Sequence, residues 1–494
     1  MIRRIALGPG FNWRLILPVL AAVLAALAVG MLVCAGYSLA IGDGAAHAFA
    51  LPAAVLVPLA GAGTLLSRRA RNVPFRSRDG YLAVTLAWIV AAAAGAAPFV
   101  LEGTLPRAVD GLFESMAGFT TTGSSLMDVE QVPDSVLLWR SLTQWLGGVG
   151  IVVLVVAIAP AAGVGSQRLF HAETSGVTQD RLTPRIADTA KIICSIYVGL
   201  TVAGFAAFFA AGMGPFDAFN HILTTISSGG YSTRSASIGA FDSLPIELVA
   251  IVFMVASGIN FAFYWRVLRG GSIWPQAAEV RAFALILLAA TVVVTTSLVI
   301  AGHDGGFWGA LRGGGFTVAS IGSGTGLVTD DYDRWNDFAR SQLLVLMFIG
   351  GCAGSTSGGI KVVRLLLLWK TVGQELQRQL RPRAVQVLRT RGRVFSEDVR
   401  RAVLAFALIY GLVALAGTFA LLITGVDAVS ALTSSVSCLA LLGTGFGTVG
   451  PTENFSSLSE SARCILMFLM LAGRLEVLTV LVLLTPAFWR RNVA

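Results

Sequence analysis

Four short tracts rich in glycine and hydroxyl residues are the part of this sequence best suited to chemistry. They read FTTTGS from Phe119, ISSGGYST from Ile226, SIGSGTGLVT from Ser320 and LLGTGFGTVGP from Leu441. Glycine reaches backbone angles that turn carbonyl oxygens towards a common axis, and rings of carbonyls can replace the hydration shell of an ion. The tracts therefore indicate a candidate cation site; the alternative is that their glycines only allow close helix packing.

Each tract follows a moderately apolar stretch that is too short to cross a membrane and fits a re-entrant helix. The stretches begin at Asp110, Asp217, Gly306 and Asp427, and aspartate is a good helix N-cap. Such a helix would aim its partially negative C-terminus at the site, which favours a cation. A unit of span, short helix, glycine tract and span therefore recurs four times.

Composition places these units in a membrane. The chain has 494 residues, of which 55% are hydrophobic and 13% charged, and its mean hydropathy is +0.76. A soluble chain is about 25% charged, so a soluble enzyme is disfavoured. We expect ten spans, at residues 15–41, 49–66, 81–101, 141–167, 192–216, 248–265, 282–302, 341–370, 402–426 and 462–488.

The sequence therefore predicts an all-α polytopic membrane protein. Its four repeats of outer helix, pore helix and inner helix would stand in a pseudo-fourfold arrangement, with two further N-terminal transmembrane helices. The expected segments are 1–79 for those two helices, then repeats at 80–168, 169–270, 271–378 and 379–494. Arginines gather at 68–78, 168–185, 266–281 and 490–491, and residues 361–401 hold eleven Lys or Arg against three acids. The positive-inside rule then predicts that both termini are cytoplasmic.

Two features stand out within the predicted inner helices. Residues 350–359 read GGCAGSTSGG, and interior glycines cost a helix about 1 kcal/mol each relative to alanine; we expect a non-helical loop there, or a mere kink. Arg474 lies in mid-span, where a charge is costly and functional by default. The alternative is a helix-to-helix salt bridge, although Glu476, two residues on, faces another side of the helix. Lys361 either joins such a barrier or extends to the cytoplasm.

Other patterns exclude several classes of function. The five cysteines form no CxxC pair and the four histidines are scattered, so no metal cluster is predicted. Gly445–Gly450 fits GxGxxG but lacks the strand–turn–helix context of a dinucleotide site, so we expect no nucleotide on this chain. The net charge of +9 fits cytoplasmic membrane loops rather than nucleic acid. Acids at 330–337 suggest an outer vestibule that concentrates cations; the alternative is the site of a membrane-embedded enzyme.

Together, the tracts, the segment GGCAGSTSGGIK from Gly350 and LAGRLEVLT from Leu471 resemble the Trk/Ktr/HKT superfamily of potassium transporters, closest to its bacterial TrkH type. The resemblance covers almost the whole chain and implies no enzymatic activity. It implies four repeats around one K⁺ path, with the family's central filter glycines at Gly123, Gly229, Gly326 and Gly443. The implied K⁺-binding residues are Thr121, Thr122, Gly123, Ser228, Gly229, Thr325, Gly326, Leu442 and Gly443. A glycine rather than serine at the first central position favours potassium over sodium.

The resemblance also implies a gate beneath the filter. Its residues would be the glycines and hydroxyl residues of the loop together with two cations, namely Gly350, Gly351, Gly354, Ser355, Thr356, Ser357, Gly358, Gly359, Lys361 and Arg474. It further implies a homodimer in the bacterial inner membrane and a separate cytosolic nucleotide-binding subunit of the TrkA or KtrA type. Two alternatives remain open, namely a sodium-permeable protein and a cation-coupled secondary transporter.

Overall fold

The computed structural model describes residues 11–67, 77–158, 186–271, 274–381, 389–390, 393–394 and 397–489. The regular secondary structure of these residues is helical, apart from a two-residue antiparallel pairing of β1 (Arg389–Thr390) with β2 (Arg393–Val394). The long helices are α1 (Trp13–Ile41), α2 (Ala46–Ser67), α3 (Ser77–Gly95), α6 (Asp134–Ile158), α8 (Ile186–Ala210), α12 (Trp274–Ile300), α15 (Val362–Leu380) and α16 (Glu397–Ile423). The shorter ones are α4 (Ala97–Glu102), α5 (Ala108–Phe119), α9 (Pro215–Ile226), α10 (Leu244–Ser257), α11 (Phe261–Leu268), α13 (Gly306–Ser323), α14 (Asp337–Met347), α17 (Ala428–Ala440), α18 (Glu460–Arg474), α19 (Leu478–Leu484) and α20 (Pro486–Trp489).

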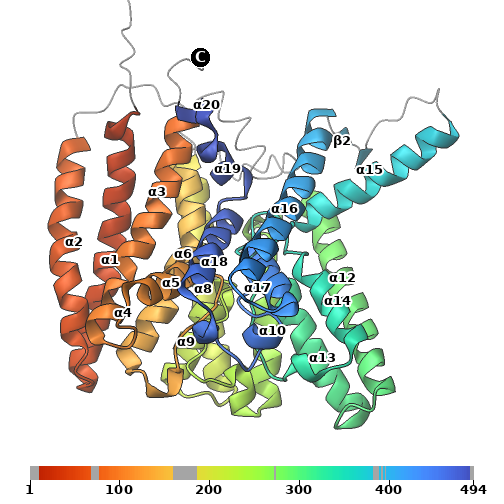
Figure 1. Ribbon diagram of the computed structural model, residues 1–494, viewed down its shortest axis with the longest axis horizontal. Coiled ribbons are helices and arrows are strands. Elements are labelled where there is room, and N and C mark those ends of the chain that lie inside the picture. The colour runs from red at the N-terminus through yellow and green to blue at the C-terminus, as the bar shows by residue number, and fades with distance from the viewer. Residues whose placement is uncertain are drawn as a thin grey trace, which may run out of the picture.

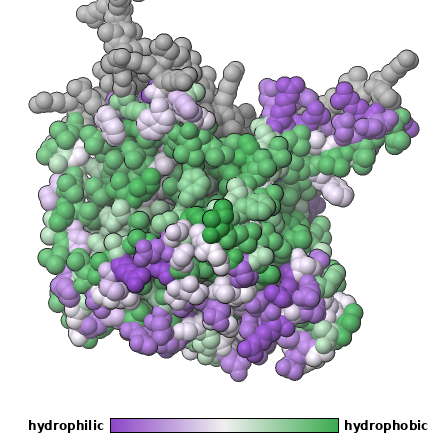
Figure 2. Space-filling view, viewed as in Figure 1, coloured by the Kyte–Doolittle hydropathy of each residue, from purple (hydrophilic) through white to green (hydrophobic). Residues whose placement is uncertain are grey.

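The described helices include six that are long and apolar enough to cross a membrane, or up to eight if each bent pair is one span. A broad apolar band covers the side of the molecule shown in Figure 2, with hydrophilic residues gathered below it. Of the other two expected spans, 141–167 is described only as far as residue 158, and 341–370 is interrupted between α14 and α15. Most of the arginine clusters that predicted the orientation, at 68–76, 168–185 and 490–491, lie outside the described residues.

Two inner helices that the sequence predicted to be continuous are broken. Helices α10 and α11 meet at 97°, and α18 and α19 at 117°. At the first break the Asn260 side chain caps α11 by accepting a 2.8 Å hydrogen bond from the Ala262 amide. At the second, Glu476 and Val477 both have positive φ, which the helix cannot accommodate. These two breaks add to the interruption predicted at 350–359, which lies between α14 and α15.

Four short helices, α5, α9, α13 and α17, precede the four glycine tracts, as the sequence predicted. They lie towards the end of the molecule opposite α15 and α20 (Figure 1). Of the three aspartates predicted to cap these helices, Asp427 is an N-cap, with its carboxylate accepting from the amides of Val429 and Ser430. Partial burial raises the pKa of Asp427, but its hydrogen bonds with Ser430 and Val429 outweigh this and lower the pKa below its usual value.

The other two predicted aspartate caps were wrong, because α5 and α9 begin before the aspartates. Their N-caps are Arg107 and Gly214, so Asp110 and Asp217 lie in the first helical turn. Asp110 instead forms an ion pair with Arg463 of α18, and Asp217 forms one with Arg234 at 3.1 Å.

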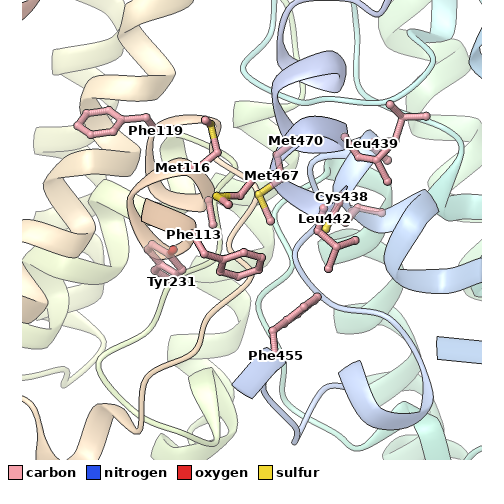
Figure 3. Close-up of a cluster of buried hydrophobic side chains, with 14 of the residues drawn as sticks. Phe113, Met116, Phe119, Tyr231, Cys438, Leu439, Leu442, Phe455, Met467 and Met470 are labelled. Atoms are coloured by element: carbon pink, nitrogen blue, oxygen red, sulfur yellow. The ribbon is translucent and has the colours of Figure 1, made fainter. Parts of the chain in front are cut away.

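Part of the apolar core lies among the short helices. Phe113 and Met116 of α5 face Met467 and Met470 of α18, and Leu439 of α17 lies close by (Figure 3). All five side chains are buried. This packing joins the first short helix of the chain to the last and brings their glycine tracts together.

Candidate functional site

The four glycine tracts share one backbone pattern. Each has a left-handed residue, then one further residue, then a glycine of positive φ. The left-handed residues are Thr121, Ser228, Gly324 and Leu441, with φ between 56° and 77°; the glycines are Gly123, Gly230, Gly326 and Gly443, with φ of 86°, 74°, 80° and 84°. Glycine adopts such angles without strain.

The hydrogen bonds of the tracts repeat in the same register. The amides of Thr122, Gly229, Thr325 and Leu442 donate to carbonyls of the preceding short helix, those of Ala117, Thr224, Ser320 and Ser437, at 2.8 to 2.9 Å. In the first three tracts the next amide donates to the same carbonyl. Since N–H and C=O of a trans peptide point in opposite directions, the carbonyls of Thr122, Gly229 and Thr325 point away from the short helices.

This register corrects one predicted residue. Gly230, not Gly229, has the conformation and hydrogen bonding of the central glycines Gly123 and Gly326. Gly229 occupies the position of Thr122. The sequence could not decide between them, because SSGG offers two adjacent glycines and either could have taken the positive φ.

The four tracts meet in chain order around one axis. A methyl group added to Gly123 would overlap the carbonyl oxygen of Gly229, and the same holds for each following pair. The pairs are Gly123 with Gly229, Gly230 with Thr325, Gly326 with Leu442 and Gly443 with Thr122. Because this series closes on itself, the carbonyls of Thr122, Gly229, Thr325 and Leu442 form a ring, which we call the carbonyl ring.

The carbonyl ring has the chemistry of a site for a dehydrated cation. No described residue donates a hydrogen bond to the carbonyls of Thr122, Thr325 or Leu442. The Thr121 hydroxyl is also buried without a partner among the described residues. Buried polar atoms normally have partners, so these oxygens fit a cation or its water. The groups of acids, histidines and cysteines in the described ranges include none that could hold a metal ion.

The 350–359 loop lies directly against three of the four tracts. The Thr356 hydroxyl is 2.7 Å from that of Ser228 in the second tract. A methyl group on Gly324 of the third tract would lie 2.7 Å from the Ser357 hydroxyl, and one on Gly358 would overlap the Ala440 carbonyl, next to the fourth tract. The structure thus places the predicted loop residues against the predicted filter residues.

The loop is fixed by hydrogen bonds to neighbouring helices. Glu279 of α12 accepts from the amides of Ala353 at 2.7 Å and Val363 at 3.3 Å, one at each limb of the loop. The Cys352 amide donates to the Gly258 carbonyl, at the break between α10 and α11. The Lys361 ammonium donates to the Ser357 carbonyl within the loop, rather than extending away from it. Glu279 was missed in the sequence because it precedes the charge-free part of its span.

Arg474 lies at the end of α18, only 3% exposed, between two backbone carbonyls. Its guanidinium donates to Thr356 in the loop at 3.2 Å and to Gly147 of α6 at 2.8 Å. No acid of the described segments lies within ion-pair distance of it. Glu476 pairs instead with Arg364. The charge of Arg474 therefore has only neutral acceptors around it, beside the loop.

A buried ion pair behind the tracts was not predicted. Glu114 of α5 pairs with Arg140 of α6 at 2.7 Å, and both side chains are almost completely buried. Glu114 also accepts from the Leu126 amide, while Arg140 stacks 3.6 Å from the centre of the Tyr231 ring. A glutamate in an apolar stretch and an arginine bordering a span were the signals available in the sequence.

The acids at 330–337 are not a free acidic rim. Asp331 pairs with Arg334 at 2.9 Å, and Asp333 pairs with Arg340 at 2.8 Å. Asp333 also accepts from the Gly447 amide beyond the fourth tract. These contacts hold the outer loops together, and the arginines reduce the field that a vestibule would need.

The apolar helices and the central site they surround define the class of a polytopic membrane transport protein. Residues 49–491 match the family model described as "Cation transport protein", TrkH. The chain is 41% identical over 457 residues to "Trk system potassium uptake protein TrkH" of Salmonella typhimurium, covering 91% of this chain and 93% of that one. It is 38% identical over 486 residues to the protein of the same name from Vibrio parahaemolyticus, covering 97% of this chain and 100% of that one.

The structure agrees with these matches. The crystal structure of the potassium transporter TrkH from Vibrio parahaemolyticus superimposes with a TM-score of 0.88 at 36% identity, covering 97% of this chain and all of that one. The chain therefore belongs to the TrkH family. The expected resemblance, the membrane location and the link to Trk potassium transport are confirmed.

Proposed function

We propose that this protein takes up K⁺ across a bacterial cytoplasmic membrane through a pore whose selectivity filter is the carbonyl ring. The observation that carries the proposal is the closed series of contacts between each central glycine and the next tract's carbonyl. Four short helices with their C-termini at this ring add partial negative charge, which favours a cation. In this reading the chain has four repeats of outer helix, pore helix and inner helix.

The loop and Arg474 would close this pore. The 350–359 loop contacts the second, third and fourth glycine tracts. Arg474 donates hydrogen bonds both to the loop and to Gly147, which lies next to the first tract. A fixed positive charge in the path repels K⁺, while glycines of positive φ in the loop, such as Gly354 and Gly359, allow the loop to refold. The structure would then represent a closed state.

The test is ion flux into proteoliposomes that contain the purified chain alone, with K⁺ and Na⁺ compared in the parent and in Gly123→Ser. The backbone at residue 123 has a φ of 86°, and a side chain there would overlap the Gly229 carbonyl. The ring must therefore distort in the variant. We expect K⁺-selective flux in the parent and a lower K⁺/Na⁺ ratio in the variant. Equal ratios in two folded proteins would contradict the filter assignment.

Two partners belong to the same proposal. Helix α15 carries exposed apolar residues along one face, Trp369, Val372, Leu376 and Leu380, which suits contact with a second copy of the chain. The basic segment 370–401 suits a cytosolic nucleotide-binding subunit, and such segments also bind anionic lipid. Light scattering of the detergent-solubilised parent and of Trp369→Glu checks the dimer; a monomeric parent would exclude it.

A further inference from the structure

One of the four ring carbonyls is bonded differently from the others. The Gly229 carbonyl accepts a 2.7 Å hydrogen bond from the side-chain amide of Gln144 in α6. The other three accept none from the residues that the structure describes. A carbonyl that is already hydrogen-bonded has less freedom to turn towards an ion than one that is not.

Gln144 holds the second tract on both sides of its central glycine. While its amide NH₂ donates to Gly229, its amide oxygen accepts from the Tyr231 amide at 3.1 Å. The two neighbours, an acceptor and a donor, fix which way the side-chain amide points. Gly230 lies between them with φ of 74°. Gln144 is fully buried, and a methyl group on Gly229 would overlap its side chain, so the fit is close.

The same face of α6 supports the tract one turn away. Arg140 precedes Gln144 by four residues, so the two side chains lie on one side of the helix. Arg140 donates to the Ser232 carbonyl at 2.9 Å and is held by Glu114. The backbone from 229 to 232 is thus held by α6 in addition to its own hydrogen bonds to Thr224 of α9.

The chain contains a natural comparison at the equivalent position of α18. A methyl group on Gly147 of α6 would overlap the Phe119 carbonyl, and one on Gly473 of α18 would overlap that of Leu439. Phe119 and Leu439 hold equal places, each two residues before a left-handed residue. Gln144 precedes Gly147 by three residues, and Met470 precedes Gly473 by three residues, so Gln144 and Met470 hold equivalent positions. Met470 lies in the apolar cluster of Figure 3 and has no polar atom to offer a carbonyl.

We propose that Gln144 is a specificity-determining residue, which sets the discrimination between K⁺ and smaller cations by fixing the Gly229 carbonyl. The proposal rests on the carbonyl ring being the K⁺ filter. Selectivity in such rings depends on cavity size and on the number and field of the coordinating carbonyls. With Gln144 in place, the second tract cannot move inward to follow a smaller ion. Without it, that carbonyl is free to approach Na⁺.

The test is the ratio of initial K⁺ and Na⁺ flux rates in proteoliposomes for the parent, Gln144→Met and Gln144→Leu, with a melting curve on each preparation. Methionine keeps most of the volume and removes both hydrogen bonds. We expect the K⁺/Na⁺ ratio to fall by about fivefold, the factor that corresponds to one net hydrogen bond. Met470→Leu is the matched control; its ratio should equal that of the parent.

The outcomes separate the two proposals. A parent that prefers K⁺, with a folded Gln144→Met or Gln144→Leu of equal preference, overturns the role of Gln144 and leaves the filter intact. A parent that carries K⁺ and Na⁺ equally overturns the filter and this inference with it. A merely structural role for Gln144 would lower the melting temperature and total flux while leaving the ratio unchanged, which also contradicts the proposal.

Discussion

At the scale of single residues, Arg474 is the clearest candidate for an electrostatic barrier. Its guanidinium is buried and bonded to the carbonyls of Thr356 and Gly147. Two like charges at roughly 5 Å and an effective dielectric constant of about 20 repel by about 3 kcal/mol. The arginine side chain carries this charge at neutral pH.

We therefore expect Arg474→Ala to raise basal K⁺ flux by about ten- to a hundredfold, the range that about 1.4 to 3 kcal/mol of barrier represents. Arg474→Lys keeps the charge and can still donate to one carbonyl, so its flux should remain close to that of the parent. Proteoliposome flux and a melting curve on the same preparation provide the measurement. An alanine variant that is less stable and no more active would make Arg474 a packing residue.

The residue scale also shows where sequence reasoning reaches its limit. Gly123, Gly326 and Gly443 were predicted as central glycines and have the expected positive φ. The second tract was misplaced by one residue, because the choice between Gly229 and Gly230 depends on which carbonyl of the next tract lies beside it. That contact joins residues far apart in the chain, so it cannot be predicted from the local sequence.

At the scale of elements, the 350–359 loop is the part most open to experiment. It replaces a helix turn where five glycines make a helix unfavourable, and it lies against three tracts. We expect removal of residues 354–357 to raise basal flux, because an obstruction is shortened. Flux of the folded deletion variant is the measurement. A deletion protein that conducts less than the parent would indicate a ligand-binding or structural loop instead.

A milder change at the same element is Glu279→Ala. One carboxylate oxygen of Glu279 accepts from the amides of both Ala353 and Val363. Its loss frees the two limbs of the loop, and hydrogen bonds to charged groups contribute about 1.5 to 3 kcal/mol. Basal flux should rise about tenfold or more, with an unchanged K⁺/Na⁺ ratio.

Glu279→Gln serves as the control for that change, because it retains an acceptor oxygen in the same place. Its flux should lie between those of the parent and the alanine variant. If Glu279→Ala folds and its basal flux equals that of the parent, the carboxylate does not hold the loop closed.

Composition predicted which short helices and interruptions exist, but not where every helix breaks or how it is capped. The four short helices and the interruption at 350–359 follow from apolar length and from glycine content. The breaks at 258–260 and 475–477 do not, since neither contains a proline or a run of glycines. They depend on Asn260 capping α11 and on positive φ at Glu476 and Val477, which tertiary contacts enforce. Similarly, Asp427 caps its helix but Asp110 and Asp217 form ion pairs across elements instead.

At the scale of the whole molecule, the arrangement favours passive conduction over coupled transport. A coupled mechanism needs an ionisable group at the ion path that can take up and release the second ion. Among the described residues, the two acids near the loop already have partners: the buried Glu279 accepts from two amides, and the part-buried Glu476 pairs with Arg364. In the proposed filter, K⁺ would be coordinated by neutral carbonyls, which need no second ion.

Uptake should therefore follow the electrochemical gradient of K⁺ alone. An inside-negative potential of about 100 mV is worth about 2.3 kcal/mol per charge, which sets an accumulation limit near 50-fold. Vesicles containing Arg474→Ala, with a fixed potential, should approach this limit and not exceed it. Adding an inward Na⁺ or proton gradient at the same potential should leave the final K⁺ ratio unchanged. Accumulation beyond the limit on adding either gradient would show that a second ion is coupled, and one of the paired acids would then have to release its partner during transport.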